Sequence, residues 1–329
     1  MNKKFLLTLC FLFISVTISF AKKAPTMPNS YDSFGLSARS FAMGHTGVAM
    51  ANNLENVFYN PAGIAYNSSE NIQAEAFASV IRNSDLDNND LQSSHPIDLG
   101  FTSFAVVQKQ GAISWRTLSS NEIEVTDGAN FYKKQEHIKA ITITAANLSN
   151  NGSAVGINLS YLYGTLSESA IDSGMPFAQT SSGNGFTMDI GFMAPIKKNL
   201  FFGVNLENVF GIMWWENYDF DQLPFGIRTG IGYVAGTFNL LCDWNKKFYR
   251  FGNIEDDTLI GVGIEQYLGN VLVLRAGAQG TSLSDTEKIK YTYGAGINIA
   301  MISLSVSGEN YKINDEPVSQ YCVSVKVLI

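Results

Sequence analysis

Acidic and basic side chains recur on one face of segments in which every second residue is apolar. Side chains of both signs in one interior could bind ions or a charged substrate, or could pair with one another and brace a wall. We favour bracing, because ion-pair networks of a structural kind are common in proteins. The candidates for this charged interior are Arg116, Arg228, Asp243, Glu265 and Arg275.

One pair among these candidates can be placed from the turn expected next to it. A three-residue turn over residues 268–270 sets Arg275 opposite Gly263 and diagonal to Glu265. Diagonal neighbours on paired strands are within reach of long side chains. We therefore expect Arg275 and Glu265 to interact across two neighbouring strands.

The other residues that could carry chemistry form no catalytic pattern. The chain has no nucleophile elbow, no phosphate-binding glycine loop and no zinc-binding spacing, and its three histidines are scattered. Glycine pairs such as Gly261 and Gly263 lie inside alternating segments, where they indicate close packing at a wall. We therefore expect no enzymatic activity, no cofactor and no metal.

The cysteines exclude a disulfide framework, because only Cys242 and Cys322 follow the first 21 residues. They fall on opposite faces of segments that lie several positions apart in the expected strand order. That separation exceeds the reach of a disulfide, so we expect both thiols to be free.

The first 21 residues have the parts of a secretory signal peptide. Lys3 and Lys4 form a basic start, residues 5–20 are mostly apolar, and residues 19–21 form a small-x-small cleavage site. Their removal takes the net charge from −7 to −9, because two lysines and no acids are lost. A negative net charge of this size argues against nucleic acid as a partner.

From about residue 70 onward, apolar and polar residues alternate over segments of roughly ten residues. There are about fourteen such segments, and their connections alternate between short and long, as in outer-membrane barrels. We therefore expect an all-β fold, a transmembrane antiparallel β-barrel over residues 70–329. The long connections are expected at residues 83–96, 121–136, 166–184, 210–224, 249–257, 280–288 and 310–316.

The two faces of these segments differ in kind. In the expected hairpin over residues 225–247, one face is apolar and aromatic, and the other is glycine-rich, polar and charged. Opposing Ala235 to Phe238 puts both apolar faces on the same side. A membrane barrel turns the apolar face to lipid, whereas a soluble sandwich would bury it. Three features favour the membrane barrel: the signal peptide, the alternation of short and long connections, and the C-terminal strand.

Residues 52–66 interrupt the alternation with helix signals. Asn52 and Glu55 have the spacing of a capping box. Pro61 ends this first helical piece by Asn60, because the residue before a proline is pushed out of the α region. Asn60 can then cap a second piece with Pro61 at its first position. We expect two short helical pieces here, and not a barrel strand.

The segment ARSFAMGHTGVAMANNLENVFYNPAGIA, residues 38–65, resembles the N-terminal signature of the FadL superfamily. These are outer-membrane transporters for long-chain fatty acids and other hydrophobic compounds, and the wider group includes PorV-like proteins associated with secretion. The resemblance implies that residues 22–69 fold inside the barrel as a plug. The residues expected to form the plug or contact a ligand are Phe41, Met43, Phe58, Tyr59, Asn60, Pro61, Ala62 and Gly63.

Aromatic residues gather in the expected external connection near residues 211–220. They form either an aromatic girdle at the outer membrane–water interface or a hydrophobic groove through which a hydrophobic ligand enters. The girdle is favoured, because aromatic residues are routine at that depth. The members of this external aromatic loop are Trp214, Trp215, Tyr218 and Phe220.

Two functions compete on these grounds. The first is a plugged channel for uptake of small hydrophobic molecules such as fatty acids. The second is a non-transporting PorV-like scaffold or shuttle involved in protein secretion. Either protein would lie in the bacterial outer membrane after export, in contact with its lipids, and would reach the outer-membrane assembly machinery through its C-terminal strand. A general porin and a soluble secreted β-protein are weaker alternatives, since a plug is unusual in a porin.

Overall fold

The computed structural model describes residues 37–51, 53–67, 71–83, 95–96, 100–127, 130–172, 175–249, 257–282, 289–313 and 316–329. The expected signal peptide, the first part of the expected plug and Asn52 lie outside these residues. Within them, no helix is long and apolar enough to cross a membrane.

Fourteen antiparallel strands close into a β-barrel, in which each strand pairs with its neighbours in the chain and β16 returns to pair with β1. The ring is complete because β8 pairs with β10, and the two-residue strands β2 (His95–Pro96) and β9 (Asp221–Gln222) only add to its rim. The barrel strands are β1 (Gln73–Asn83), β3 (Phe101–Gln108), β4 (Gly111–Asp127), β5 (Asn130–Leu148), β6 (Ala154–Asp172), β7 (Met175–Lys197), β8 (Leu200–Trp215), β10 (Phe225–Val234), β11 (Phe238–Phe248), β12 (Asp257–Leu268), β13 (Leu272–Gly280), β14 (Lys290–Ile299), β15 (Ile302–Ile313) and β16 (Glu316–Leu328).

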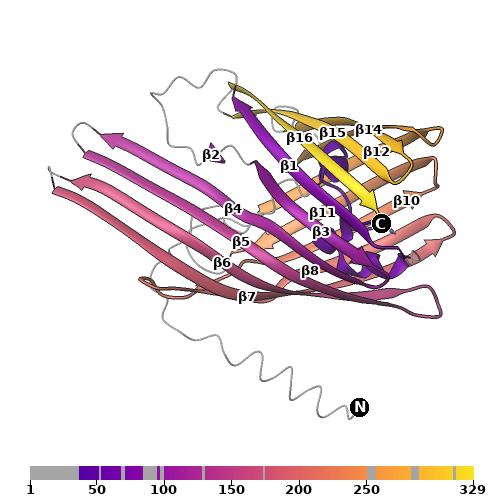
Figure 1. The fold of residues 1–329 in the computed structure, drawn as a ribbon, viewed down its shortest axis with the longest axis horizontal. Helices are drawn as coiled ribbons and strands as arrows, with labels where there is room; N and C mark the ends of the chain where they lie inside the picture. Colours follow the sequence, from indigo (N-terminus) through magenta and orange to yellow (C-terminus); the bar gives the residue numbers. More distant parts are fainter. Residues whose placement is uncertain are drawn as a thin grey trace, which may run out of the picture.

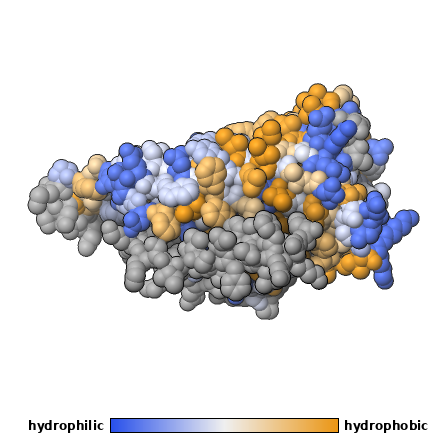
Figure 2. Space-filling view, turned by 90° about the horizontal axis from the view of Figure 1, so that it is seen from below, coloured by the Kyte–Doolittle hydropathy of each residue, from blue (hydrophilic) through white to orange (hydrophobic). Residues whose placement is uncertain are grey.

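The alternation seen in the sequence is the alternation of the barrel wall, since successive side chains of a strand point to opposite faces. In β6, Ile157 and Leu159 are exposed on the outside, whereas Asn158 and Ser160 are buried inside. Apolar residues therefore cover much of the outer surface, and Figure 2 shows hydrophobic residues gathered between more hydrophilic ends. The two cysteines are free as expected, with Cys242 exposed and Cys322 buried.

The strand registers agree with one expectation and correct another. Ala235 donates its backbone N–H to the carbonyl of Phe238, 3.1 Å away, and closes the predicted β10–β11 hairpin. Arg275 lies directly opposite Glu265, so the predicted diagonal placement was wrong. The turn runs over residues 269–271, with Gly269 at a φ of +66°, and this moves β13 by two residues relative to the expectation.

The strands differ greatly in length, and this corrects the predicted connections. Strands β5 and β6 have 19 residues each and β7 has 23, whereas β10 has 10 and β13 has 9. Residues 121–127, 130–136, 166–172 and 175–184, predicted as parts of external loops, are strand. Figure 1 shows β4–β7 extending as a one-sided wall well beyond the other strands.

Residues 37–67 form three short helical pieces, α2 (Ala38–Ala42), α3 (Asn56–Tyr59) and η1 (Pro61–Tyr66). Asn60 caps η1 as predicted, by accepting a hydrogen bond from Ala62 N at 3.1 Å. Glu55 makes no side-chain cap to α3 and instead accepts from the Ser37 hydroxyl. Helix α2, which Ser37 caps, was not predicted.

The C-terminal strand should be essential for assembly, because β16 pairs with β15 on one side and β1 on the other. Removing residues 319–329 leaves both neighbours with unpaired backbone groups, which a bilayer does not tolerate. We expect the truncated chain to lose heat-modifiable migration on gels. Val323→Ala keeps the backbone pairing and should migrate normally; normal assembly of the truncation would contradict the closed barrel.

Candidate functional site

The wall carries glycines where the backbone of residues 37–67 comes closest to it. A Cβ atom added at Gly261, Gly263 or Gly277 would lie 2.2 to 2.4 Å from backbone atoms of Met43 or Gly44. Gly156 and Gly203 show the same crowding, at 2.4 and 2.3 Å from backbone atoms of other parts of the segment. The predicted meaning of the glycine pairs, close packing at the inner wall, is confirmed.

Asp243, on the inner face of β11, holds the turn of the N-terminal segment. Its Oδ2 atom accepts backbone hydrogen bonds from Gly47 N at 2.6 Å and Val48 N at 3.0 Å. A second wall contact joins Gly44 N to Thr292 Oγ1 at 2.9 Å. The wall thus provides acceptors for backbone N–H groups in the connection between α2 and α3.

Asn60 links two parts of the segment to the wall and is fully buried. Its Nδ2 atom donates to Val48 O at 2.8 Å and to Phe192 O of β7 at 3.0 Å. Further along, the Tyr66 hydroxyl donates to Gly152 O at 2.7 Å, in the short turn between β5 and β6. The segment therefore reaches the end of the barrel that carries the short turns.

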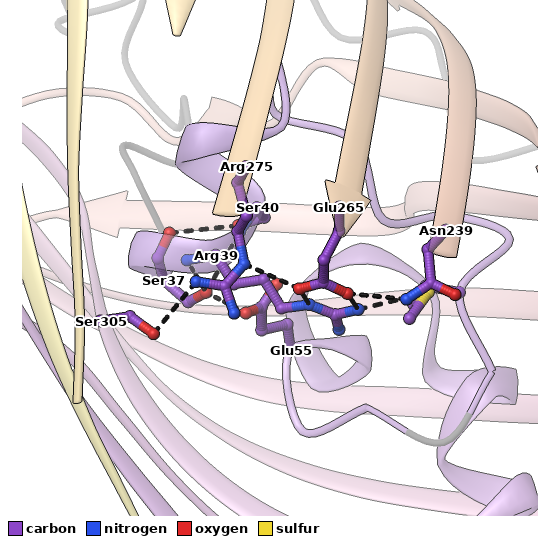
Figure 3. A network of polar contacts seen from close by, with 9 residues as sticks. Ser37, Arg39, Ser40, Glu55, Asn239, Glu265, Arg275 and Ser305 are labelled. Carbon is purple, nitrogen blue, oxygen red and sulfur yellow. Dashed lines mark hydrogen bonds and ion pairs between the residues drawn. The ribbon is translucent and has the colours of Figure 1, made fainter. Parts of the chain in front are cut away.

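Glu265 and Arg275 belong to a network that joins helix α2 to the wall (Figure 3). The buried Glu265 carboxylate binds Arg39 through two contacts, at 2.7 and 2.5 Å, and Arg275 Nε at 2.7 Å. Asn239 Nδ2 donates to the same carboxylate at 2.7 Å, and Arg275 Nη1 reaches Ser305 Oγ at 3.2 Å. Two guanidinium groups share one carboxylate, so this network fastens the segment to β12 and β13.

The other predicted arginines stack on aromatic rings of α3. Arg116 lies 5.8 Å from the centre of the Phe58 ring, and Arg228 lies 5.5 Å from that of Tyr59. Arg228 Nε also pairs with Glu207 Oε1 at 2.6 Å. Each of the five predicted charged residues therefore contacts the segment or a residue that does, as expected of a bracing network.

The residues predicted to form the plug or contact a ligand are buried between the segment and the wall. Phe41 packs with Phe77 and Cys322, and Met43 packs with Leu241. The remaining six are also buried and lie along α3 and η1: Phe58, Tyr59, Asn60, Pro61, Ala62 and Gly63.

A separate apolar cluster faces the lumen from the longer strands; we call it the lumenal apolar cluster. Its strands place Ala140, Leu162 and Met213 in one row, with Gly185 between the last two. Ile138 and Trp215 lie one row further from the short turns, separated by Gly164 and Gly183. The full cluster is Leu118, Ile138, Ala140, Leu162, Leu166, Met213, Trp215 and Leu223.

Polar side chains border the lumenal apolar cluster on both sides. Toward the short turns, Thr142 and Ser160 share a hydrogen bond of 2.7 Å. Toward the tall end, Ser119 donates to Glu136 Oε1 at 2.6 Å. The cluster is thus an apolar zone with polar rows on either side of it. The sequence-based prediction missed it, although Leu162 is the one large apolar residue on the inward face of residues 153–164.

The predicted external aromatic loop is divided between the two sides of the wall. Trp214 is 48 % exposed on the outside, whereas Trp215 is 5 % exposed and belongs to the cluster. Tyr218 packs against the cluster, and Phe220 is exposed. The four residues therefore do not form one surface, because neighbouring residues of β8 point to opposite faces.

Tyr218 is held in place by charged groups on the part of β4–β7 that extends beyond the other strands, which we call the tall wall. Its hydroxyl donates to Glu168 Oε2 at 2.7 Å, and Lys134 Nζ lies 3.2 Å from Glu168 Oε1. Burial and the nearby Glu168 carboxylate raise the pKa of Tyr218, so its hydroxyl stays protonated at neutral pH. The Tyr218 ring therefore covers the lumenal apolar cluster with its hydroxyl tied away from it.

Replacing Asp243 by Asn should loosen the N-terminal segment. Hydrogen bonds to a charged acceptor are worth more than neutral ones, and the amide retains only one accepting oxygen. We expect amide hydrogen exchange in residues 44–51 to become about tenfold faster in detergent. The matched control is Asp219→Asn, which changes an exposed carboxylate. Equal exchange in the variant and the unchanged chain would show that Asp243 does not hold the turn.

The chain resembles known proteins in its fold and not in its sequence. No family model and no curated protein sequence matches the chain. Among solved structures, the toluene transporter TbuX of Ralstonia pickettii has a TM-score of 0.67 at 12% identity, covering 91% of this chain and 99% of that one. CymD, a monoaromatic hydrocarbon channel, has a TM-score of 0.64 at 12% identity over 90% of this chain and 98% of its own. A FadL homologue of Pseudomonas aeruginosa has a TM-score of 0.59 at 8% identity, with 91% and 99% covered. The chain therefore has the fold of FadL-type channels, as the N-terminal resemblance led us to expect.

Proposed function

We propose that this protein is an outer-membrane channel for uptake of small hydrophobic molecules. The observation that carries the proposal is the lumenal apolar cluster, which lies inside a barrel whose neighbouring inner rows are polar. An apolar ligand that leaves water for this zone gains about 25 cal/mol per Å² of its own apolar surface, so the zone favours an apolar ligand. The structural neighbours TbuX and CymD are described as a toluene transporter and a monoaromatic hydrocarbon channel, which supports this choice of cargo.

The barrel is proposed to cross the outer membrane with its short turns in the periplasm. At about 3.3 Å per residue and a tilt near 40°, a strand of about ten residues spans the apolar band of roughly 25 Å. Strands β10–β15 have about that length, whereas β4–β7 continue beyond it. The tall wall would then stand outside the cell, and the outer surface and C-terminal strand would contact lipids and the assembly machinery.

Residues 22–69 are proposed to act as a plug, between a signal peptide at 1–21 and the barrel at 70–329. Support comes from the fully buried Asn60 and from the wall contacts of Arg39 and Gly47. Helices as short as α2 and α3 are not stable alone in water, so the segment depends on the wall for its structure.

The route proposed for a ligand begins at Tyr218 and the lumenal apolar cluster, and continues toward the plug. A small cavity already lies between the plug and the wall, lined by Leu54, Phe58 and Ala105 together with Glu55, Glu75 and Ser103. Movement of the plug or a gap in the wall would then release the ligand.

Changing the cluster should reduce uptake without affecting assembly. Leu162→Asn puts an amide into the apolar zone, where it lacks partners, and such burial costs on the order of 1–3 kcal/mol. We expect cells that express the variant to take up a radiolabelled alkylbenzene about tenfold more slowly than cells with the unchanged chain. Thr165→Asn, an exposed position of the same strand, is the control.

Heat-modifiable migration should be normal for both variants. Uptake equal to that of cells lacking the protein, even with the unchanged chain, would refute transport. Native mass spectrometry that then finds a stable protein partner would favour a secretion scaffold.

Deleting residues 31–66 should open the lumen to ions. The segment's backbone fills space along the wall of at least five strands, as the crowding at their glycines shows. We expect the deleted protein to keep heat-modifiable migration and to show raised ion conductance in planar bilayers. Unchanged conductance would mean that the segment is not a stopper.

A further inference from the structure

We propose that the lumenal apolar cluster selects molecules in which an apolar body carries one neutral hydrogen-bond acceptor, and that Trp215 Nε1 donates to that acceptor. This inference rests on the proposed function and narrows its cargo. Ketones, ethers and alcohols on a small aromatic or aliphatic body have the required chemistry. A pure hydrocarbon such as toluene would enter the same zone without this hydrogen bond and would bind more weakly.

Trp215 carries a buried donor without a partner. The residue is 5 % exposed within the cluster, and its buried Nε1 atom has no hydrogen-bond partner among the residues that the structure describes. A buried indole N–H normally finds a partner, because leaving a donor unpaired away from water is costly. The unpaired donor therefore marks a place where a ligand oxygen would be favoured.

The other tryptophans of the chain show that this feature belongs to Trp215. Trp115 Nε1 donates to the Tyr163 hydroxyl at 2.8 Å. Trp214 and Trp244 point outward and are exposed. Of the four, only Trp215 combines burial among apolar side chains with an unpaired donor.

The wall is shaped to hold the Trp215 ring in this position. A Cβ atom added at Gly183 would lie 2.5 Å from Cε3 and 2.7 Å from Cζ3 of Trp215, so the six-membered ring lies directly against β7. Any larger residue at position 183 would displace the ring. Tyr218 packs against the cluster, but Trp215 Nε1 makes no hydrogen bond to its hydroxyl, which donates to Glu168.

The charges around the cluster favour a neutral acceptor over a carboxylate. Asp221 lies opposite Met213 at the edge of the cluster, and Glu136 and Glu168 lie on its tall side. Arg116, beside Ala140, and Lys134, beside Glu168, supply the positive charge. Three acids against two bases leave no surplus positive charge for an anion, and a neutral oxygen is buried at lower cost.

The test compares two ligands of nearly equal size, ethylbenzene and acetophenone, which differ by a carbonyl oxygen. Binding to the full-length protein in detergent is measured by calorimetry for the unchanged chain, Trp215→Phe and Trp214→Phe. Trp215→Phe keeps an aromatic ring and removes the donor. We expect it to weaken acetophenone binding about fivefold and to change ethylbenzene binding by less than about twofold. Trp214→Phe should change neither.

A second measurement uses the unchanged chain and so does not depend on the folding of a variant. With ¹⁵N-labelled tryptophan, acetophenone should shift one indole N–H signal downfield, the one that Trp215→Phe removes, and ethylbenzene should not. Benzoate at neutral pH should bind at least about tenfold more weakly than acetophenone.

The outcomes separate the two proposals. Binding of both ligands with equal losses in Trp215→Phe, or no indole shift, would overturn the donor role of Trp215 and leave hydrocarbon uptake standing. Benzoate that binds as tightly as acetophenone would overturn the preference for a neutral acceptor. An assembled protein that binds none of the three compounds would overturn the proposed function itself.

Discussion

The close approach of the N-terminal backbone to the inner wall is the constraint on which the rest of the interior depends. At Gly156, Gly203 and Gly263 the wall has no room for even one carbon atom. At such distances wall side chains such as Asp243 reach backbone N–H groups in the connection between α2 and α3, which no helix pairs. The segment and the wall are therefore one polar and steric unit, and the charged residues of the lumen serve that unit first.

Further from the short turns, the inner face of the barrel carries the lumenal apolar cluster. Where the wall meets the segment, glycine, serine, asparagine and charged residues stand among smaller apolar contacts such as Phe77 and Leu241. Around Leu162 and Trp215, the inward side chains form one apolar cluster. Glycines recur in both regions for different reasons. Gly263 admits a backbone, whereas Gly183 admits the flat face of an indole ring. The change in what the glycines face marks the boundary between the held segment and the lumenal apolar cluster, the proposed ligand-binding zone.

The sequence predicted the number of strands, their order and the lumenal position of the charged residues, because alternation reports directly on a wall with lipid on one side. The prediction failed where a strand is polar on both faces, because such a strand shows no alternation. In residues 121–136, Glu122 points outward and Glu136 inward, so both faces are polar and the segment looked like a loop. The role of Trp215 was equally hidden, since two adjacent tryptophans look alike until the register of β8 assigns one to each face.

The position of the cluster explains why strands β4–β7 extend beyond the other strands of the barrel. Of the strands that form this tall wall, β4, β5 and β6 supply Leu118, Ile138 and Leu166, and the adjacent β8 supplies Trp215. Their extension carries Lys134 and Glu168, which hold the Tyr218 ring over the cluster. An apolar zone open to water would be costly. The Tyr218 ring packs against that zone, while Trp215 Nε1 makes no hydrogen bond to Tyr218 or to any other described residue. Extension, cover and unpaired donor are thus parts of one arrangement, in which the ligand oxygen completes what the protein leaves unpaired.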